Sequence, residues 1–320
     1  MPASANFPLQ NSCQKLTGIF QRAISQRNPA QWLYKTDARS ELFLAESQAR
    51  ILAAALKSKK MEKAFKTFKK LEDILGKIDD YNSLAKLFAG HKGVRKEEVS
   101  YFIKKRNKAI DKLNDRLIKK EFYQDVFYKI YKGAAIDFDD KKIHAQLHRQ
   151  LLEEMNKCFR FYSLFANGFT DMEGQVHELR RKLRWFSIYG RSFEGSIVLE
   201  KNKIHRHWEE KFISKKGLSS SYNKLPPGKG LKLHLMFDQK AFYAMNAVIA
   251  ILGDIKNRGL AIEELAAAIS KNRGISAKEA EAMAMKQLRT GYSVTSLLQE
   301  AHILLAGFFD VYAIHRQLIR

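Results

Sequence analysis

The sequence predicts an all-α protein, because three features of its composition and spacing favour helices over strands. Proline is scarce, with five residues in a chain of 320, and few segments alternate apolar and polar residues as half-buried strands do. Helix-forming residues such as Lys, Leu, Ala, Glu and Gln instead occur in long runs. Apolar residues within these runs lie three and four positions apart, which is the spacing of one helix face. The chain is long enough for one large domain or two modest ones.

Residues 1–36 are predicted to be a weakly patterned N-terminal extension, and a first helical half is predicted to follow at residues 37–168. Gly90 and Gly93 mark a loop within this half, and Asp137, Asp139 and Asp140 are expected to cap its last helix. The expected helices cover residues 37–56, 59–80, 97–120, 122–131 and 141–165.

A second helical half is predicted at residues 169–320, with a mobile loop at residues 214–230. Paired lysines, serines and the Pro226-Pro227-Gly228 sequence make this loop the least regular part of the chain. The expected helices cover residues 176–193, 237–253, 261–271, 276–288 and 294–318.

A short sequence repeat links the two halves. Ile-Leu-Gly-x-Ile occurs at residues 74–78 and again at residues 251–255. A glycine near a helix end either lets a neighbouring backbone approach or permits a left-handed termination, so Gly76 and Gly253 are expected at such positions. The repeat favours two related halves, although a match this short also arises by chance in a leucine-rich helical chain.

The segment 176–193 has one strongly basic side. On a helix, its apolar residues fall on one side and five basic residues fall on the opposite side, with no acidic residue interspersed on that basic side. This face suits a polyanion, whereas a solvated surface face is the simpler alternative. The basic residues are His177, Arg180, Arg181, Arg184 and Arg191. The apolar residues are Leu179, Leu183, Phe186, Tyr189 and Phe193.

Basic residues also follow a helical spacing in the first half. The formal net charge is +23, of which residues 241–320 contribute only +2. Such a charge opposes compaction unless an anion is bound, and nucleic acid, anionic lipid and inorganic polyphosphate all qualify. A solvated lysine face is again the alternative. The candidate binding residues of this half are Lys59, Lys63, Lys66, Lys70, Lys104, Lys105, Arg106 and Lys108.

These motifs resemble the CHAD domain family, whose name refers to a conserved histidine in an α-helical domain. The resemblance rests on His177-x-Leu179-Arg180, on Arg184 and on the repeated Leu-Gly-x-Ile segments, and it covers the chain from about residue 37 to the C-terminus. It implies two pseudo-symmetric antiparallel helical bundle halves that form one compact unit with a basic groove. It also implies non-catalytic binding of inorganic polyphosphate. No His-x-Leu-Arg sequence occurs near residues 41–50, so the first half is expected to contribute its lysines instead.

Two other functions stay open at this point. Trp185, Tyr189 and Trp208 lie near basic residues, and aromatic rings that stack on bases are typical of RNA- or DNA-binding proteins. A metal-dependent phosphohydrolase is the less favoured alternative, since the pairs Asp79-Asp80 and Asp139-Asp140 are more simply helix ends.

No catalytic residue, metal site or cofactor is predicted. His144 and His148 are four residues apart, and His205 and His207 flank Arg206, but neither pair has a third ligand at a standard spacing. The sequence also has no nucleotide-binding P-loop.

A cytoplasmic protein without membrane contact, associated with polyphosphate granules, is expected. Two cysteines, Cys13 and Cys158, are too few for a disulfide framework, which favours a reducing compartment. The N-terminus has no apolar signal segment, and no later window reaches about 18 uncharged apolar residues.

Overall fold

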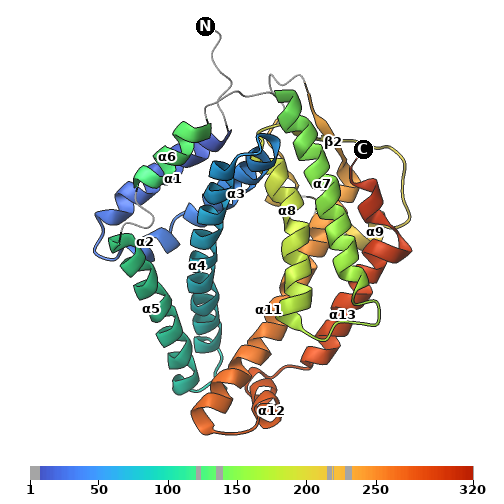
Figure 1. The fold of residues 1–320 in the computed structure, drawn as a ribbon. Helices are drawn as coiled ribbons and strands as arrows, with labels where there is room; N and C mark the ends of the chain where they lie inside the picture. The colour runs from blue at the N-terminus through green and yellow to red at the C-terminus, as the bar shows by residue number, and fades with distance from the viewer. Residues whose placement is uncertain are drawn as a thin grey trace. The chain divides into compact units, whose positions relative to one another are not determined.

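Figure 1 shows the helical fold in a computed structural model, which describes residues 8–119, 124–134, 140–214, 218, 220–227 and 233–319. Helices account for 77% of the chain and strands for 3%, which confirms the all-α prediction. The chain divides into two compact units, Met1–Gln146 and Leu147–Arg320, and helix α7 (Asp140–Ser163) contributes to both. The pseudo-symmetry of two halves and their predicted boundaries stay predictions.

The first unit is built from helices that bury aromatic rings between them. Its N-terminal helix is formed by residues that were expected to be only an extension. This helix packs against the rest of the unit through apolar side chains, of which Leu16 and Phe20 are fully buried. The ring of Phe20 lies 4.9 Å from that of Phe127. The helices are α1 (Pro8–Ile24), α2 (Pro29–Tyr34), α3 (Ala38–Ala55), α4 (Lys59–Ala89), α5 (Lys96–Ile118) and α6 (Gln124–Ala134).

Helix α4 is the long central helix of this unit and packs against both α3 and α5. It begins at the predicted residue, where the Ser58 side chain accepts a hydrogen bond from the backbone N–H of Met61. It continues nine residues beyond the predicted end at residue 80, because Ala85 and Phe88 extend its buried stripe. The Phe88 ring packs 4.9 Å from that of Phe102 on α5.

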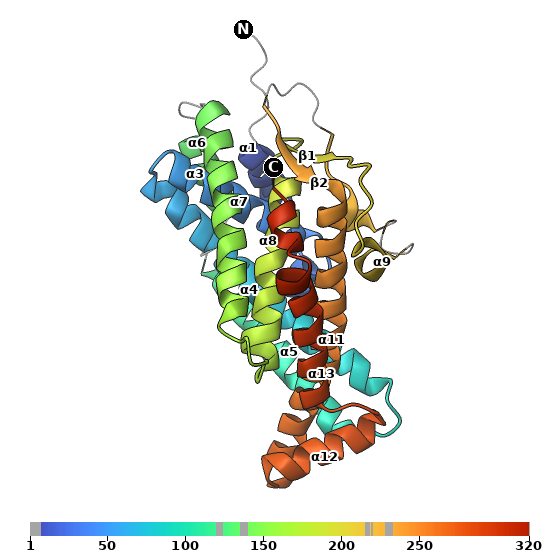
Figure 2. The ribbon, with the colours of Figure 1, turned by 90° about the vertical axis from the view of Figure 1, so that its right-hand side faces the viewer.

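The second unit surrounds one long helix. Helix α11 packs against α8, α12 and α13 (Figure 2). The longer elements after α7 are the π-helical turn Met172–His177 and the α-helices α8 (Glu178–Ser192), α11 (Gln239–Arg273), α12 (Ala277–Leu288) and α13 (Val294–Ala306). The shorter ones are β1 (Ile197–Glu200), α9 (Glu209–Phe212), the 3-10 turn Ser221–Asn223 and β2 (Leu235–Asp238).

The prediction of two helices at residues 237–253 and 261–271 is wrong. Both belong to α11, which runs without interruption from Gln239 to Arg273. Gly253 and Gly259 lie inside it, where buried contacts outweigh the helix-weakening effect of glycine of about 1 kcal/mol each. The left-handed termination occurs instead at Gly274, with φ of 67°.

The C-terminal segment also differs from its prediction. A single helix over residues 294–318 was expected, but α13 ends at Ala306 and a π-helical turn, Gly307–Val311, follows. Ala313, with φ of 44°, then reverses the chain into the 3-10 turn Ile314–Gln317. The returning chain forms an antiparallel bridge between Ile319 and Phe237 of β2, and β2 itself pairs in parallel with β1.

One segment, Val294–Val311, is long and apolar enough by composition to cross a membrane, with a mean hydropathy of 1.2. A third of it is buried within the protein, and core helices of soluble proteins share this composition. The expectation of no membrane contact therefore stays a prediction.

The described part of the loop predicted at residues 214–230 is attached to two helices. Asn223 is buried, and its side-chain oxygen accepts a hydrogen bond of 2.9 Å from Asn246 of α11. Asn246 in turn accepts a hydrogen bond of 2.6 Å from Ser187 of α8. Residues 215–217, 219 and 228–230 of this loop lie outside the described residues, as do the predicted capping residues Asp137 and Asp139.

Candidate functional site

Helix α8 has the predicted apolar side. Leu179, Leu183 and Phe186 are fully buried, which fixes the rotation of the helix about its axis. The turn before it begins at Asp171, whose carboxylate accepts hydrogen bonds from the backbone N–H groups of Glu173 and Gly174. With this rotation, some basic side chains of α8 are half-buried, some pair with acidic side chains and some are exposed.

Arg180 does not point to solvent as predicted, but lies half-buried against α11. Its Nε donates a hydrogen bond of 3.0 Å to the carbonyl oxygen of Ile249. A Cβ atom added at Gly253 would lie only 2.9 Å from the Arg180 Nε, so only glycine leaves room for the guanidinium. Burial lowers the pKa of Arg180 below its usual value, because it disfavours the charged form.

The first occurrence of the repeat has the same arrangement. A Cβ atom added at Gly76 would lie 2.8 Å from Nη2 of Arg39. Each glycine of the Ile-Leu-Gly-x-Ile repeat therefore makes room for an arginine side chain. Neither the predicted close approach of a backbone nor the predicted helix end occurs there. Arg39 was not predicted, because no His-x-Leu-Arg motif marks it and it lies two positions before the segment 41–50.

The two arginines differ in how their charge is balanced. Arg39 donates hydrogen bonds of 2.8 Å to Glu72 and 3.0 Å to Asp79, so two carboxylates compensate it. Arg180 has no carboxylate partner among the residues that the structure describes. The half-buried Arg180 thus has its Nε fixed by a backbone carbonyl, and no acid in the described part of the chain neutralises its charge.

The remaining basic face of α8 has more acidic neighbours than the sequence suggested. His177 lies 2.8 Å from Glu173, and Arg181 lies 3.9 Å from Glu178. The hydrogen bond with His177 is the main cause that lowers the pKa of Glu173. Lys182, 3.2 Å from Glu178, also takes part. Arg184 is half-buried and Arg191 is exposed, so only part of the predicted face is a plain basic surface.

The predicted lysines of α4 form an exposed row. Lys59, Lys63, Lys66 and Lys70 are all exposed, and they extend over roughly 16 Å of the helix. Lys69, which was not predicted, pairs with Asp73 at 2.9 Å on the same helix.

The four predicted residues of α5 split into two kinds. Lys104 and Lys108 are exposed. The Lys105 amino group lies over the rings of Tyr81 and Tyr101, at 5.2 and 4.6 Å, and Arg106 donates a 3.3 Å hydrogen bond to Asn82. Lys105 and Arg106 therefore make contacts within the first unit that support the fold.

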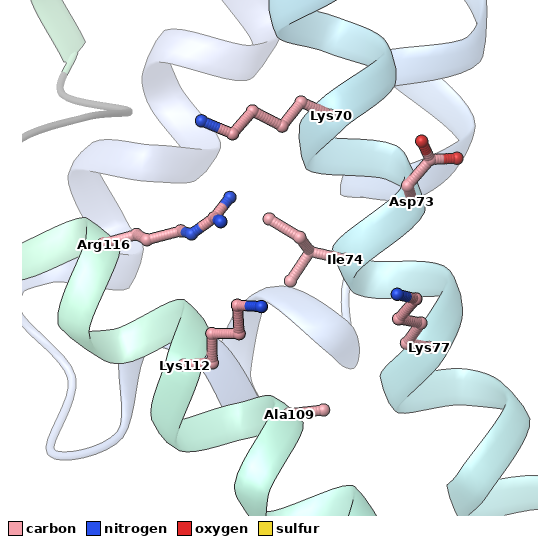
Figure 3. A pocket seen from close by; sticks show the side chains of 7 residues that line it. All are labelled: Lys70, Asp73, Ile74, Lys77, Ala109, Lys112 and Arg116. Atoms are coloured by element: carbon pink, nitrogen blue, oxygen red, sulfur yellow. The ribbon is translucent and has the colours of Figure 1, made fainter.

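A cavity of about 210 Å³ lies between α4 and α5, and sequence reasoning missed most of its lining (Figure 3). Lys70 was predicted, whereas Lys77, Lys112 and Arg116 were not. Continuing the lysine spacing along α4 would have included Lys77, which follows Lys70 by two turns. Lys112 and Arg116 follow Lys108 on α5 in two steps of four residues.

The aromatic residues suggested for base stacking are mostly unavailable. Tyr189 and Trp208 are buried, with at most 1% of their surface exposed, and Trp185 packs 5.6 Å from Tyr189. Two of the three rings therefore belong to the core, so they carry no argument for nucleic-acid binding.

No group of three or more His, Cys, Asp and Glu side chains that could hold a metal ion lies among the described residues. His144 and His148 are neighbours on α7, and the ring of exposed His207 packs against Tyr312 at 5.1 Å. Cys13 and Cys158 are both buried, and burial raises the pKa of the Cys13 thiol to about 12, which disfavours a reactive thiolate.

No known protein family, no curated protein and no solved structure matches this chain.

Proposed function

We propose that this protein binds inorganic polyphosphate without catalysis, and that Arg180 and Arg184 of α8 form the centre of the binding site. The observation that carries the proposal is the half-buried charge of Arg180, which has no carboxylate partner among the described residues. The CHAD resemblance favours the same ligand and the same residues.

Folding removes part of the charged Arg180 side chain from water, which costs free energy. A partly buried cation is unfavourable unless an anion or hydrogen bonds compensate it. The Nε of Arg180 is occupied by Ile249, which orients the guanidinium and leaves its two terminal amino groups for a ligand. Two parallel N–H groups match the oxygens of a phosphate better than the point charge of a lysine does.

Other cations on the same helix extend the proposed site, namely Arg181, Arg184 and Arg191. The lysine row of α4 is a separate line of exposed charge in the first unit. A polyphosphate chain has charges at short intervals, so consecutive cations gain more from it than from separate phosphate ions. Binding should release counterions and weaken steeply as salt rises.

The proposal is tested by titrating the protein with long-chain polyphosphate at moderate salt, with an RNA or DNA oligomer of equal charge as competitor. Polyphosphate is expected to bind and to resist the competitor. Equal or stronger binding of the oligomer would contradict the preference and favour a nucleic-acid ligand. Release of phosphate that stops on metal chelation would contradict the non-catalytic role.

Gly253→Ala provides a prediction specific to Arg180. The new Cβ displaces the guanidinium, so polyphosphate affinity is expected to fall roughly tenfold, equivalent to one charge-assisted hydrogen bond of about 1.5 kcal/mol. The free energy of unfolding should change little, because alanine gains about 1 kcal/mol of helix propensity that offsets the lost contact.

Gly76→Ala is the matched control, since it displaces Arg39 from the equivalent contact. Its affinity for polyphosphate should equal that of the wild type in the same calorimetric titration. Equal affinities for all three proteins would show that the position of Arg180 does not matter for binding.

A further inference from the structure

The cavity between α4 and α5 is a second positively charged site, separate from the arginines of α8. Its lining combines charged side chains with the apolar residues Ile74 and Ala109. In Figure 3, Lys70 and Lys77 extend from α4, and Lys112 and Arg116 from α5, around the side chain of Ile74. Four cations from two helices thus line one space.

The single acid of the lining does not cancel this charge. Asp73 accepts hydrogen bonds of 2.9 and 3.0 Å from Lys69, which is not part of the lining. In Figure 3 its carboxylate points away from α5. The positive charge of the cavity therefore exceeds what Asp73 can neutralise.

The apolar part of the lining leaves room for an anion beside the cations. Ala109 has the shortest side chain of the lining, so it leaves open space on α5 opposite Ile74. Lys77 and Lys112 are exposed, so their attraction to an anion is screened and should weaken as salt rises.

The dimensions and charge identify the class of ligand. A volume of about 210 Å³ corresponds to roughly seven water molecules at about 30 Å³ each, which is space for a compact anion. Cations that approach from two helices suit a tetrahedral, multiply charged group better than a single planar carboxylate.

We propose that this cavity binds the phosphate groups of a short oligophosphate, such as pyrophosphate or triphosphate, with Lys77 and Lys112 as its principal cations. This site goes beyond the proposed polyphosphate site and does not depend on Arg180. The same chemistry is offered by a free oligophosphate and by the phosphate end of a nucleotide, so both are used as probes.

The test is isothermal titration of the full chain with pyrophosphate, tripolyphosphate and ATP in metal-free buffer. Tripolyphosphate is expected to bind the wild type, and the double variant Lys77→Ala with Lys112→Ala to bind it at least tenfold more weakly. If ATP binds the wild type and this binding is lost in the double variant, the site accepts a nucleotide. If ATP does not bind while tripolyphosphate does, the ligand is a free oligophosphate. Failure of all three probes to bind the wild type would overturn the proposal.

Three further variants separate this site from other effects. Ala109→Leu fills the cavity without changing any charge and should also weaken binding at least tenfold. Lys86→Ala with Lys96→Ala removes two exposed lysines from the same helices outside the cavity, so its affinity should stay within twofold. The loss of tripolyphosphate affinity caused by Lys77→Ala with Lys112→Ala should be the same in the wild-type and the Arg180→Gln background, which keeps a failure here distinct from a failure of the α8 site.

The unfolding midpoint gives an independent readout. Without ligand, the Lys77→Ala and Lys112→Ala double variant should unfold at or above the wild-type temperature, because like charges are removed. With tripolyphosphate, the wild type should gain stability and the double variant should not. Equal gains in both proteins would overturn the assignment to this cavity.

Discussion

Replacing Arg206 with alanine is expected to destabilise the protein by about 3–5 kcal/mol, because it leaves a buried charge without its partner. Arg206 donates two hydrogen bonds, of 2.9 and 2.7 Å, to the carboxylate of Asp238, which is fully buried. Asp238 also caps α11 by accepting a hydrogen bond from the backbone N–H of Ala241.

The contacts of Asp238 determine whether its carboxyl group is ionised in the folded protein. Burial by itself raises its pKa, but the hydrogen bonds from Arg206 and Ala241 outweigh burial and hold the pKa below its usual value. The ionised carboxylate is therefore the folded-state form, and it cannot be left unpaired without a large cost.

Urea unfolding of the wild type, Arg206→Ala and the double variant Arg206→Met with Asp238→Leu measures this effect. The double variant should be more stable than the single one, since it removes both charges together. A loss below about 1 kcal/mol in Arg206→Ala would show that the pair behaves as an exposed ion pair.

Acidification is expected to destabilise the protein through His315. Its pKa is lowered to about 4, first by burial and second by the neighbouring charge of Arg316, while a backbone hydrogen bond with Phe308 and the charge of Asp310 oppose the shift. The ring stacks on that of Phe159, with centroids 4.9 Å apart, and packs against that of Phe309, with centroids 5.1 Å apart.

His315 binds a proton at different pH values in the folded and unfolded states. In the unfolded chain the imidazole binds a proton near pH 6.5, whereas in the folded protein it stays neutral until about pH 4. The contribution of neutral His315 is complete above pH 6.5 and is lost as pH falls toward 4. A shift of this size is worth about 3 kcal/mol.

The measurement is the difference in unfolding free energy between wild type and His315→Phe at pH 7 and at pH 4.5. The wild type should lose stability relative to the variant by roughly 2–3 kcal/mol over this interval. Using the difference removes the contributions of other titrating groups, including Glu46 and Glu263, whose burial raises their pKa to about 7. A parallel pH dependence of the two proteins would contradict the role of His315.

Much of the helical architecture could be predicted from the sequence, because helix periodicity and capping are local properties. The α12 helix begins after Ser276, where a capping box with Glu279 forms as its sequence indicates. The short parallel strands β1 and β2 were missed, since four-residue strands have too little pattern to distinguish them from loops.

The errors at the site come from contacts between distant segments. A helical wheel orients Arg180 away from Leu179 and Leu183, but it does not reveal that α11 presents a glycine beside it. For the same reason Gly253 was predicted at a helix end, although it lies inside α11 and makes room for the arginine. The lysines of the α4–α5 cavity were partly missed because their convergence depends on the register of two helices.

The central claim is that the charge of Arg180 serves an anionic ligand, whereas the equivalent charge of Arg39 serves the fold. The most direct measurement compares the polyphosphate affinities of Arg180→Gln and Arg39→Gln, each at a temperature where it is folded. Arg180→Gln should lower affinity about tenfold or more, and Arg39→Gln should keep wild-type affinity while losing stability, because Glu72 loses its partner. Equal affinities for the two variants, or a larger loss in Arg39→Gln, would contradict the claim.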